Sequence, residues 1–188
     1  MARPIEYDID EVLEGAMSPY CAKGFLATGI RELVQATGLT TRSLYNLFES
    51  KEGLYEAALR KYGTEYCEGI YSLLGTGRGR EAIVAMFEKL SGKEMQGGCF
   101  MVHTLNEQSL LEDHCVRTAK AHFKKLERLL VQKLDEMSED GEFDGDSTRT
   151  ARVLLLVMQG ASSYRQDSRN AKHLSAVVED VLKALGIV

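Results

Sequence analysis

The sequence contains little proline, few runs of β-branched residues and no long apolar segment. Its only prolines are Pro4 and Pro19, whereas Leu, Ala, Glu, Lys and Arg recur at helical spacing along most of the chain. Because these residue types favour helices and proline disrupts them, the pattern predicts an all-α fold. The apolar content of 44% suffices to bury a core, which excludes an intrinsically disordered chain.

No segment has the features of a membrane span or an export signal. The longest wholly apolar run covers Val153 to Met158, far short of the about 20 residues that cross a bilayer, and the N-terminus lacks the apolar centre of a signal peptide. The four cysteines lie far apart, without a CxxC pair. We therefore expect a cytoplasmic protein with reduced thiols and no membrane partner.

The chain also lacks the excess of positive charge that is common in nucleic-acid-binding proteins. Its net charge is −5, and the segment through Tyr62 carries seven Lys or Arg against nine Asp or Glu. Phosphate binding depends on where the cations lie rather than on their total, so DNA binding is not excluded. The balance does predict weak non-specific binding.

Glycines and capping residues divide the chain into helices. Asp8 or Asp10 is expected to cap a first helix that ends at Gly24 and is kinked at Pro19, and a second helix ends at Gly38. Further helices are expected over residues 41–48 and 51–74 and over Glu81–Leu90, Cys99–Leu110, Val116–Met137, Thr148–Arg165 and Ala171–Leu185.

The most informative segment covers residues 29–48, GIRELVQATGLTTRSLYNLF. It reads as two short helices joined at Gly38, with apolar residues spaced to pack them together and polar residues on the second helix. This layout is typical of a helix-turn-helix, whose second helix enters the DNA major groove. The alternative is an ordinary surface helix with solvated polar residues, which the turn glycine and the apolar spacing disfavour.

The first turn of the second helix carries side chains suited to DNA. Arg42 can make a bidentate contact with guanine, Tyr45 can place its ring on the core and its hydroxyl on a phosphate, and Lys51 combines a cation with a helix N-terminus. Hydroxyl and amide side chains nearby can bind phosphates or base edges. The candidate DNA-binding residues are Thr28, Thr40, Thr41, Arg42, Ser43, Tyr45, Asn46 and Lys51.

The segment KGFLATGIRELVQATGLTTRSLYNLFESKEGLYEAAL resembles the N-terminal domain of the TetR family of transcriptional repressors. The match covers roughly residues 9–62 without a gap, and includes Gly38, the Leu44, Tyr45 and Phe48 core and the start of the fourth helix. Pro19 and Gly29 depart from the family pattern, which suggests a less rigid domain without removing a DNA contact.

The resemblance implies a homodimer that places one recognition helix of each subunit in each half of a pseudo-palindromic operator. It also implies a C-terminal helical domain that binds a small ligand and pairs the subunits. With the GTGRG break at Gly75 to Gly79 as a boundary, we expect a DNA-binding domain over residues 1–50, a connecting helix over 51–74, and a regulatory and dimerisation domain over 75–188.

The last two expected helices carry apolar stripes that fit the family's dimerisation helices. As ordinary amphipathic stripes they fit an intrachain core equally well. A dimer interface built from them would be isologous, with each patch meeting its own copy. The candidate interface residues are Val153, Leu154, Val157, Ala161, Val177, Val178, Val181 and Leu182.

An effector site is expected among the middle helices, between Phe87 and Phe123. Cys99, His103 and Glu107 recur at i, i+4 and i+8, so they would share one face of a helix. Three interpretations stay open for this face: part of the core, the lining of a pocket for a small molecule, or a metal or redox site.

A metal site there would need more ligands than one helix supplies, since zinc commonly takes four. His114 and Cys115 would complete it only if the fold brought them close to Cys99. Redox sensing would follow if the helix N-terminus lowered the pKa of Cys99, whereas a buried thiol would be inert. We expect no bound cofactor or structural metal.

The sequence thus predicts a transcriptional regulator, most simply a repressor released from DNA by a small molecule. The alternative of the same fold is a redox- or metal-responsive regulator that uses Cys99. An enzyme is not expected, because no nucleophile elbow, phosphate-binding glycine loop or paired-carboxylate motif occurs. A helical adaptor that no longer reads DNA has only the low positive charge in its favour, and the effector, operator and sense of regulation are not encoded in any motif.

Overall fold

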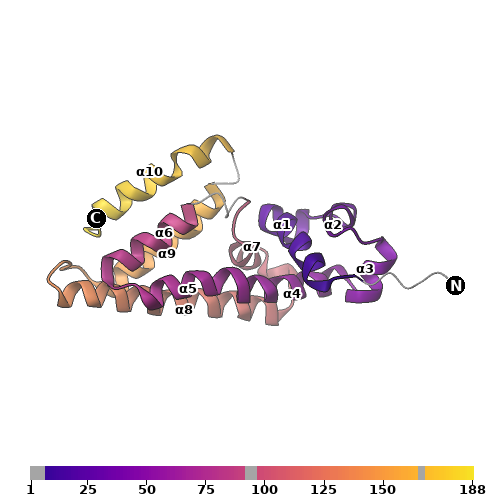
Figure 1. The fold of residues 1–188 in the computed structure, drawn as a ribbon, viewed down its shortest axis with the longest axis horizontal. Helices are drawn as coiled ribbons and strands as arrows, with labels where there is room; N and C mark the ends of the chain where they lie inside the picture. Colours follow the sequence, from indigo (N-terminus) through magenta and orange to yellow (C-terminus); the bar gives the residue numbers. More distant parts are fainter. Residues whose placement is uncertain (1–6, 92–96, 165–167) are drawn as a thin grey trace.

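The computed structural model describes residues 7–91, 97–164 and 168–188, with the backbone alone for residues 91 and 168–172. All regular structure in these ranges is helical, in agreement with the all-α prediction (Figure 1). The elements are α1 (Ile9–Ala27), α2 (Ile30–Thr37), α3 (Thr41–Phe48), α4 (Lys51–Tyr62), η1 (Gly63–Cys67), α5 (Glu68–Thr76), α6 (Gly79–Ser91), α7 (Phe100–Asn106), η3 (Gln108–Leu110), α8 (Asp113–Glu139), α9 (Ser147–Tyr164) and α10 (Ser168–Ala184).

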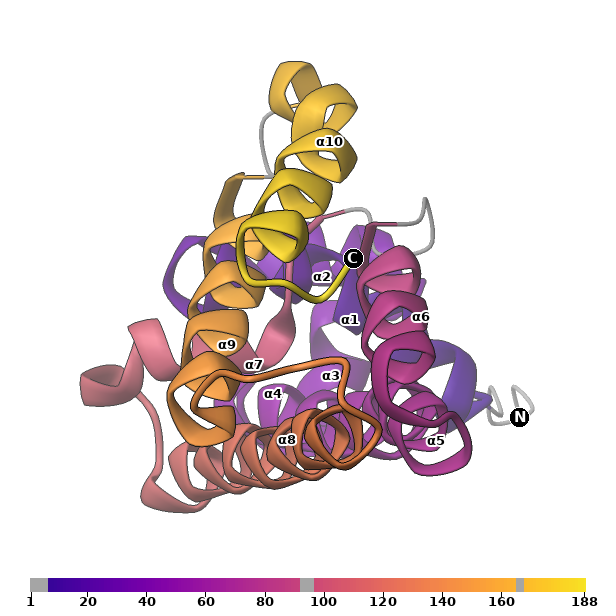
Figure 2. The same cartoon turned by 90° about the vertical axis from the view of Figure 1, so that its left-hand side faces the viewer.

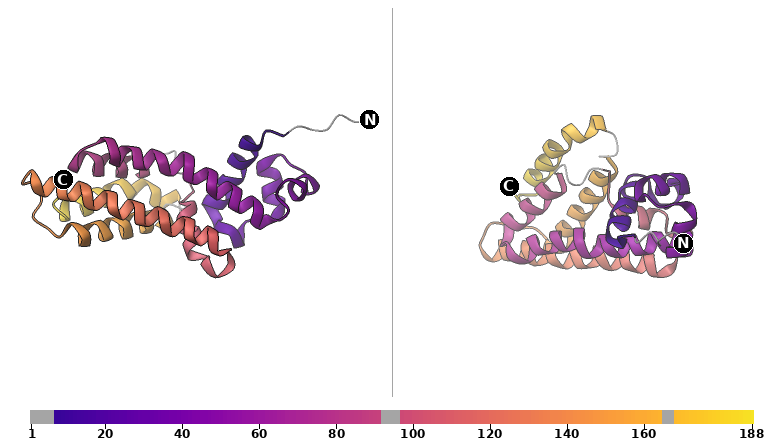
Figure 3. Two further views of the ribbon diagram at one scale, coloured as in Figure 1. Left: turned by 90° about the horizontal axis from the view of Figure 1, so that it is seen from below. Right: turned by 45° about the vertical axis from the view of Figure 1, so that its right-hand side comes forward.

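The molecule is elongated, with α1–α3 gathered at one end. We name α1–α3 the head and α5–α10 the body, with α4 joining them. The continuous run of α4 and α5 lies alongside the long helix α8 (Figures 1 and 3). Helices α6 and α9 pack against the far end of α8, and α10 lies against α6 and α9 on the side away from α8 (Figure 2). The short helix α7 is the part of the body that lies next to the head, and it contacts α1 as well as α8.

One continuous hydrophobic core joins the head to the body. Aromatic rings carry it across the junction: Tyr55 of α4 packs edge-on against Tyr20 of α1 and Phe100 of α7, with centroids 4.8 Å apart in both pairs. All three rings are fully buried. Because the head shares this core, its orientation depends on α4 and α7 as well as on its own three helices. The expected boundaries after residues 50 and 74 stay a prediction.

Helix α1 is interrupted at Gly24 rather than at Pro19. Asp8 caps the helix by accepting from the Asp10 amide at 2.9 Å, and the only non-helical backbone within α1 is at Gly24, with φ 76° and ψ −169°. The kink expected at Pro19 was therefore wrong, since the backbone at this buried proline stays helical. Gly24, expected as the stop of the helix, does break it, because its positive φ is unfavourable for other residues.

The second and third helices match the expected helix-turn-helix. Gly38 ends α2 in the left-handed conformation, with φ 69° and ψ 2°, and the Thr40 hydroxyl caps α3 by accepting from the Ser43 amide at 3.1 Å. A further glycine brings α1 against α2, because a Cβ on Gly15 would lie 2.3 Å from the Ala36 carbonyl oxygen. Helix α2 thus packs against α1 at contact distance, and α3 packs against α2 and α4.

The connecting helix is continuous but contains a π-helical segment, η1, that the sequence pattern did not reveal. Buried positions follow helical spacing up to Tyr62 and then resume at Cys67, five residues later, instead of Tyr66. The wider π turn accommodates the extra residue, so that the buried stripe continues and Tyr66 stays on the surface, stacked on Tyr62 at 5.2 Å. Such segments often lie at functional sites.

A buried ion pair fixes the turn between α5 and α6 against α8. The Lys133 ammonium, with a side chain only 4% exposed, donates to Glu136 at 2.7 Å and to the Gly77 carbonyl at 3.0 Å. The same Glu136 accepts from the Gly79 amide at 2.9 Å. The charge pair therefore satisfies backbone groups of the turn that burial would otherwise leave without partners.

Candidate DNA interface and effector pocket

The polar face of α3 is exposed at the end of the molecule. The side chains of Thr41, Arg42, Tyr45 and Asn46 are all exposed. Tyr45 is 43% exposed, so its ring extends further from the core than expected. Three hydroxyl groups meet at the start of the helix: the Ser43 hydroxyl lies 2.9 Å from both the Thr40 and the Tyr7 hydroxyls.

Arg42 is exposed and available for contact. No acidic side chain in the described part of the chain forms an ion pair with it. A guanidinium held on the first turn of an exposed helix has the geometry of a base reader. The position of Arg42 therefore agrees with the role predicted for it.

Thr28 does not belong to this surface. Its side chain is 0% exposed, and its hydroxyl donates to the carbonyls of Gly24 at 2.6 Å and Pro19 at 3.2 Å. The hydroxyl thus satisfies carbonyls at the C-terminal end of α1, where intrahelical partners run out. Its predicted role as a DNA contact is replaced by that of a structural cap.

Lys51 is also drawn inward. Its ammonium donates to the Phe25 carbonyl at 2.5 Å and lies 4.2 Å from the centroid of the Phe25 ring, and burial lowers its pKa. The expected projection of this cation toward a phosphate was wrong for the conformation described. The side chain instead joins the start of α4 to the end of α1.

The other cations of this end of the molecule are largely neutralised. Lys23 pairs with Glu32 at 2.7 Å, and Lys61 pairs with Asp10 at 3.1 Å. Of the cations on α1 to α4, Arg31 and Arg42 are the exposed ones that form no ion pair with any described residue. The local electrostatics thus favour a few specific contacts over broad attraction to phosphates.

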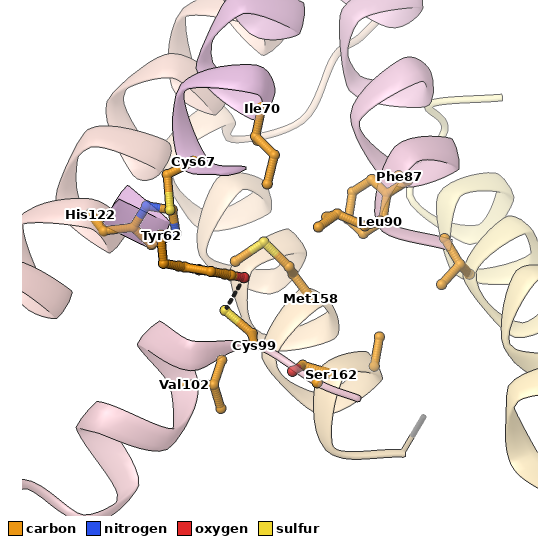
Figure 4. Close-up of a pocket in the computed structure, with 13 residues that line it drawn as sticks. Tyr62, Cys67, Ile70, Phe87, Leu90, Cys99, Val102, His122, Met158 and Ser162 are labelled. Atoms are coloured by element: carbon orange, nitrogen blue, oxygen red, sulfur yellow. Dashed lines mark hydrogen bonds between the residues drawn. The ribbon is translucent and has the colours of Figure 1, made fainter. Parts of the chain in front are cut away.

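A mainly apolar cavity lies in the body where several helices converge (Figure 4). Its volume of about 30 Å³ leaves room for one or two waters, so the cavity must widen to take a drug-sized ligand, which needs about 300 Å³ or more. Its lining residues are Tyr62, Cys67, Ile70, Phe87, Leu90, Gly98, Cys99, Val102, His122, Met158, Ala161, Ser162 and Val178.

Only part of the predicted pocket lining is correct. Phe87 and Cys99 line the cavity, whereas Phe123 does not and is packed in the core. The helix expected over Cys99–Leu110 ends at Asn106, where Glu107 takes φ −105° and ψ 21° before the short η3. Since the helix does not continue, the expected i, i+4, i+8 face does not exist.

His103 and Glu107 instead face the end of α1. A Cβ on Gly24 would lie 2.9 Å from His103 Nδ1 and 2.5 Å from Glu107 Oε2. Burial lowers the pKa of His103, although the charge of Glu107 opposes the shift. These two residues therefore belong to the contact between body and head rather than to the pocket.

His122 is a polar pocket residue that the sequence analysis missed. Its Nδ1 lies 2.5 Å from the Tyr71 hydroxyl, and burial, together with Lys125, lowers its pKa to about 4. The ring is therefore neutral, and its tautomer decides whether Nδ1 accepts from the Tyr71 hydroxyl or donates to it. The only advance signal was a histidine on the apolar face of α8, which is also typical of plain core.

Cys99 lies at the start of α7, half-buried in the cavity wall (Figure 4). The Tyr62 hydroxyl donates to its sulfur at 3.6 Å. Burial raises the pKa of Cys99 despite backbone hydrogen bonds at the helix start. The condition for redox sensing, a lowered pKa of Cys99, is therefore not met in this conformation, because desolvation of the thiolate outweighs the helix terminus.

Among the residues that the structure describes, the cysteines and histidines are not gathered into a metal-ligand cluster. Within residues 7–91, 97–164 and 168–188, no group of three or more His, Cys, Asp or Glu side chains is arranged to hold an ion. His114 lies 3.4 Å from Cys115 and 3.0 Å from Glu56, on a different surface from the cavity. In the same ranges, no helix has the length and apolarity needed to span a bilayer.

The candidate dimer residues divide into two groups. Leu154, Val178 and Leu182 are at most 5% exposed in the single chain, so a partner has nothing left to cover and these three belong to the intrachain core. Val153, Val157, Ala161 and Val181 are half-buried, and Val177 is 50% exposed. The exposed apolar side chains on these helices also include Leu156 and Tyr164, which the sequence analysis did not select.

Comparison with known proteins places the head in a defined family of sequences. Residues 12–58 match the family described as bacterial regulatory proteins, tetR family. The chain is 28% identical to the HTH-type transcriptional repressor ComR of Escherichia coli K12, over 96% of this chain and 90% of that protein.

Solved structures share the fold over nearly the whole chain. A cysteine mutant of the TetR family transcriptional regulator CifR, complexed with 26-bp double-strand operator DNA, superposes with a TM-score of 0.78 at 26% identity, covering 97% of this chain and 99% of that one. The reduced form of E. coli NemR gives a TM-score of 0.68 at 25% identity, covering 91% and 94%.

Proposed function

The chain belongs to the TetR family of bacterial regulatory proteins, and from this we propose a DNA-binding repressor that a small molecule releases from a pseudo-palindromic operator. The observation that carries the proposal is the exposed face of α3, where Arg42, Tyr45 and Asn46 extend from a helix packed against α2 and α4. These side chains supply a base reader, an aromatic hydroxyl and an amide at the spacing that a major groove accepts.

The test is a fluorescence anisotropy titration of the full-length protein with DNA from upstream of its own gene. We expect Arg42→Ala to weaken binding by about 1–3 kcal/mol per half-site and to relax the preference for one base pair. Tyr45→Phe should weaken binding if the hydroxyl contacts a phosphate. Arg128→Ala is the matched control, since Arg128 is an exposed cation on α8. Unchanged affinity of Arg42→Ala would overturn the assignment of α3.

A homodimer is part of the proposal, because one α3 reads only half of a symmetric site. Exposed apolar side chains support an interface built from α9 and α10: Leu156 of α9 is 68% exposed and Val177 of α10 is 50% exposed. Leu156→Glu should give a monomer in analytical ultracentrifugation, whereas Leu110→Glu, at a 50% exposed leucine of η3, should stay dimeric. A dimeric Leu156→Glu protein would contradict this interface.

The effector that we propose for the cavity is uncharged and mainly apolar. Among the described residues, the lining carries no Lys, Arg, Asp or Glu side chain, and the His122 ring is neutral at physiological pH because its pKa is about 4. In the tautomer in which Tyr71 donates to Nδ1, the Nε2–H of His122 is a donor to which an effector carbonyl or similar acceptor can bind. A charged effector would enter without a compensating charge, which is unfavourable.

A second candidate is a regulator that senses oxidants or electrophiles through Cys99. Cys99 is the cysteine whose side chain is half-buried, while Cys21, Cys67 and Cys115 are buried, and a reagent that reached it would enter the cavity. Its raised pKa keeps the thiol protonated and slow to react, which favours the small-molecule proposal. Loss of operator release by peroxide in Cys99→Ser, with release retained in Cys115→Ser, would reverse this preference.

A further inference from the structure

The loop at the end of α1 is held by a carboxylate from the body. The positive φ of Gly24 interrupts the helix directly before the amides of Phe25 and Leu26. Glu107 accepts from both, with Oε2 2.6 Å from the Phe25 nitrogen and Oε1 3.0 Å from the Leu26 nitrogen. One carboxylate thus binds two successive backbone N–H groups, an arrangement that suits anions and gives strong, charge-assisted hydrogen bonds.

Gly24 and Glu107 are sterically matched. A Cβ on Gly24 would lie 2.5 Å from Glu107 Oε2 and 2.9 Å from Glu107 Cδ. A side chain there would displace the carboxylate, in addition to the strain of a positive φ. The glycine therefore serves two purposes: it breaks α1, and it opens the space that the carboxylate occupies.

Two side chains of α4, those of Lys51 and Tyr55, contact the same loop. The Lys51 ammonium donates to the Phe25 carbonyl at 2.5 Å, and the Phe25 ring packs edge-on against Tyr55, with centroids 5.3 Å apart. The Tyr55 hydroxyl in turn lies 2.9 Å from the Thr104 hydroxyl of α7. Helix α7 therefore reaches the base of the head at two points, through Glu107 directly and through Thr104 by way of α4.

The opposite end of α7 forms a wall of the cavity. Gly98, Cys99 and Val102 line it, and Figure 4 places Cys99 and Val102 at the first turn of the helix. The seven residues of α7 span only about 10 Å at 1.5 Å per residue. A molecule that pushes on this wall therefore moves a short rigid element whose other end holds the head.

We propose that Glu107 is a latch through which the cavity controls the orientation of the head. While its carboxylate holds the Phe25 and Leu26 amides, the head stays in its DNA-binding orientation. An occupant that shifts α7 by about 1 Å stretches these bonds beyond hydrogen-bond range and releases the head. The inference rests on the proposed function, and it makes Glu107 a positioning residue that touches neither DNA nor effector.

A double-mutant cycle on the full-length protein tests the latch without a known effector. Val102→Phe adds bulk to the cavity wall and stands in for an occupant, and Glu107→Ala removes the latch. Operator affinity is measured for both single variants and for the double variant. Glu112→Ala is the matched control, since Glu112 is an exposed carboxylate that makes no capping hydrogen bond.

We expect Val102→Phe and Glu107→Ala each to weaken operator binding at least tenfold, and Val102→Phe to add less than a twofold effect once Glu107 is removed. Glu112→Ala should bind like the wild type. If Val102→Phe weakens binding by the same factor with and without Glu107, or has no effect in the wild type, the latch is refuted.

Amide hydrogen exchange provides a second test of the latch that does not require DNA. Exchange at Phe25 and Leu26 should become at least tenfold faster in both Glu107→Ala and Val102→Phe, and unchanged exchange in either would overturn the latch. If Val102→Phe does not fold, Cys99→Met adds volume at the same wall. Faster exchange in a protein that binds no operator would refute the proposed function while supporting the latch.

Discussion

The small number of free cations on the head predicts an unusually shallow dependence of DNA binding on salt. Among the described residues of α1 to α4, Lys23 and Lys61 are held in ion pairs, and Lys51 is bound to the Phe25 carbonyl. Arg31 and Arg42 are exposed without an ion pair to a described residue. A dimer therefore brings about four cations to the DNA.

The magnitude follows from counterion release. If Arg42 also neutralises phosphate charge, four cations give a slope of log K against log [salt] of at most about −3.6 in magnitude, so raising KCl threefold should weaken operator binding by at most about fiftyfold. Removing Arg31 from both subunits should reduce the slope by about 1.8, equally for operator and unrelated DNA, if it binds phosphate. Arg42→Ala should also reduce discrimination between operators, since we assign it to a base.

The assay is an anisotropy titration of labelled operator at several KCl concentrations, with Arg128→Ala as the control whose slope stays at the wild-type value. A wild-type slope steeper than about −6 would refute the reasoning. It would mean that Lys23, Lys51 and Lys61 leave their partners to bind phosphates, and the head described here would then not be the DNA-bound conformation.

Three further predictions concern stability, measured by urea denaturation. Lys133→Met should lower the free energy of unfolding by about 3–5 kcal/mol, because it leaves Glu136 and the Gly77 carbonyl without their buried partner; a loss below about 1 kcal/mol would contradict this. Burial opposes ionisation of Glu136, but hydrogen bonds from Lys133 and neighbouring groups outweigh it and lower its pKa. The stabilisation is therefore complete above about pH 4.5 and is lost as the pH falls through the lowered pKa, so wild type and Glu136→Gln should converge in acid. Gly15→Ala should cost about 1–3 kcal/mol, whereas Gly75→Ala, with open space around it, should be neutral or slightly stabilising.

The elements of the head could be predicted because their signals are local. Gly38 and the capping hydroxyl of Thr40 determine where helices end and begin through bonds to residues three or four positions away. The exposure of Arg42 and Asn46 follows from the period of the helix alone. These positions need no knowledge of which other helix lies nearby.

The errors concern residues whose role depends on contacts between distant segments. Thr28 matched a family motif, but its hydroxyl is taken by the end of α1. Glu107 fitted a pocket only while its helix was assumed to continue, and its actual partners lie about eighty residues earlier in the chain. His122 was overlooked because its neutral state and its bond to Tyr71 arise from burial between helices. No periodicity encodes such contacts.

The π segment between Tyr62 and Glu68 divides the continuous helical run of α4 and α5 into two halves. Each half keeps its own packing contacts. Without it, one extra residue would turn every later side chain by about 100°, and Ile70 and Leu74 would lose their places in the body. With it, α4 can remain in phase with the head while α5 remains in phase with α8. Such π turns are rare and often lie at functional sites; here Tyr62, which precedes the segment, and Cys67, its last residue, both line the cavity. The change of phase between head and body therefore lies at the level of the cavity, where a bound molecule would touch it directly.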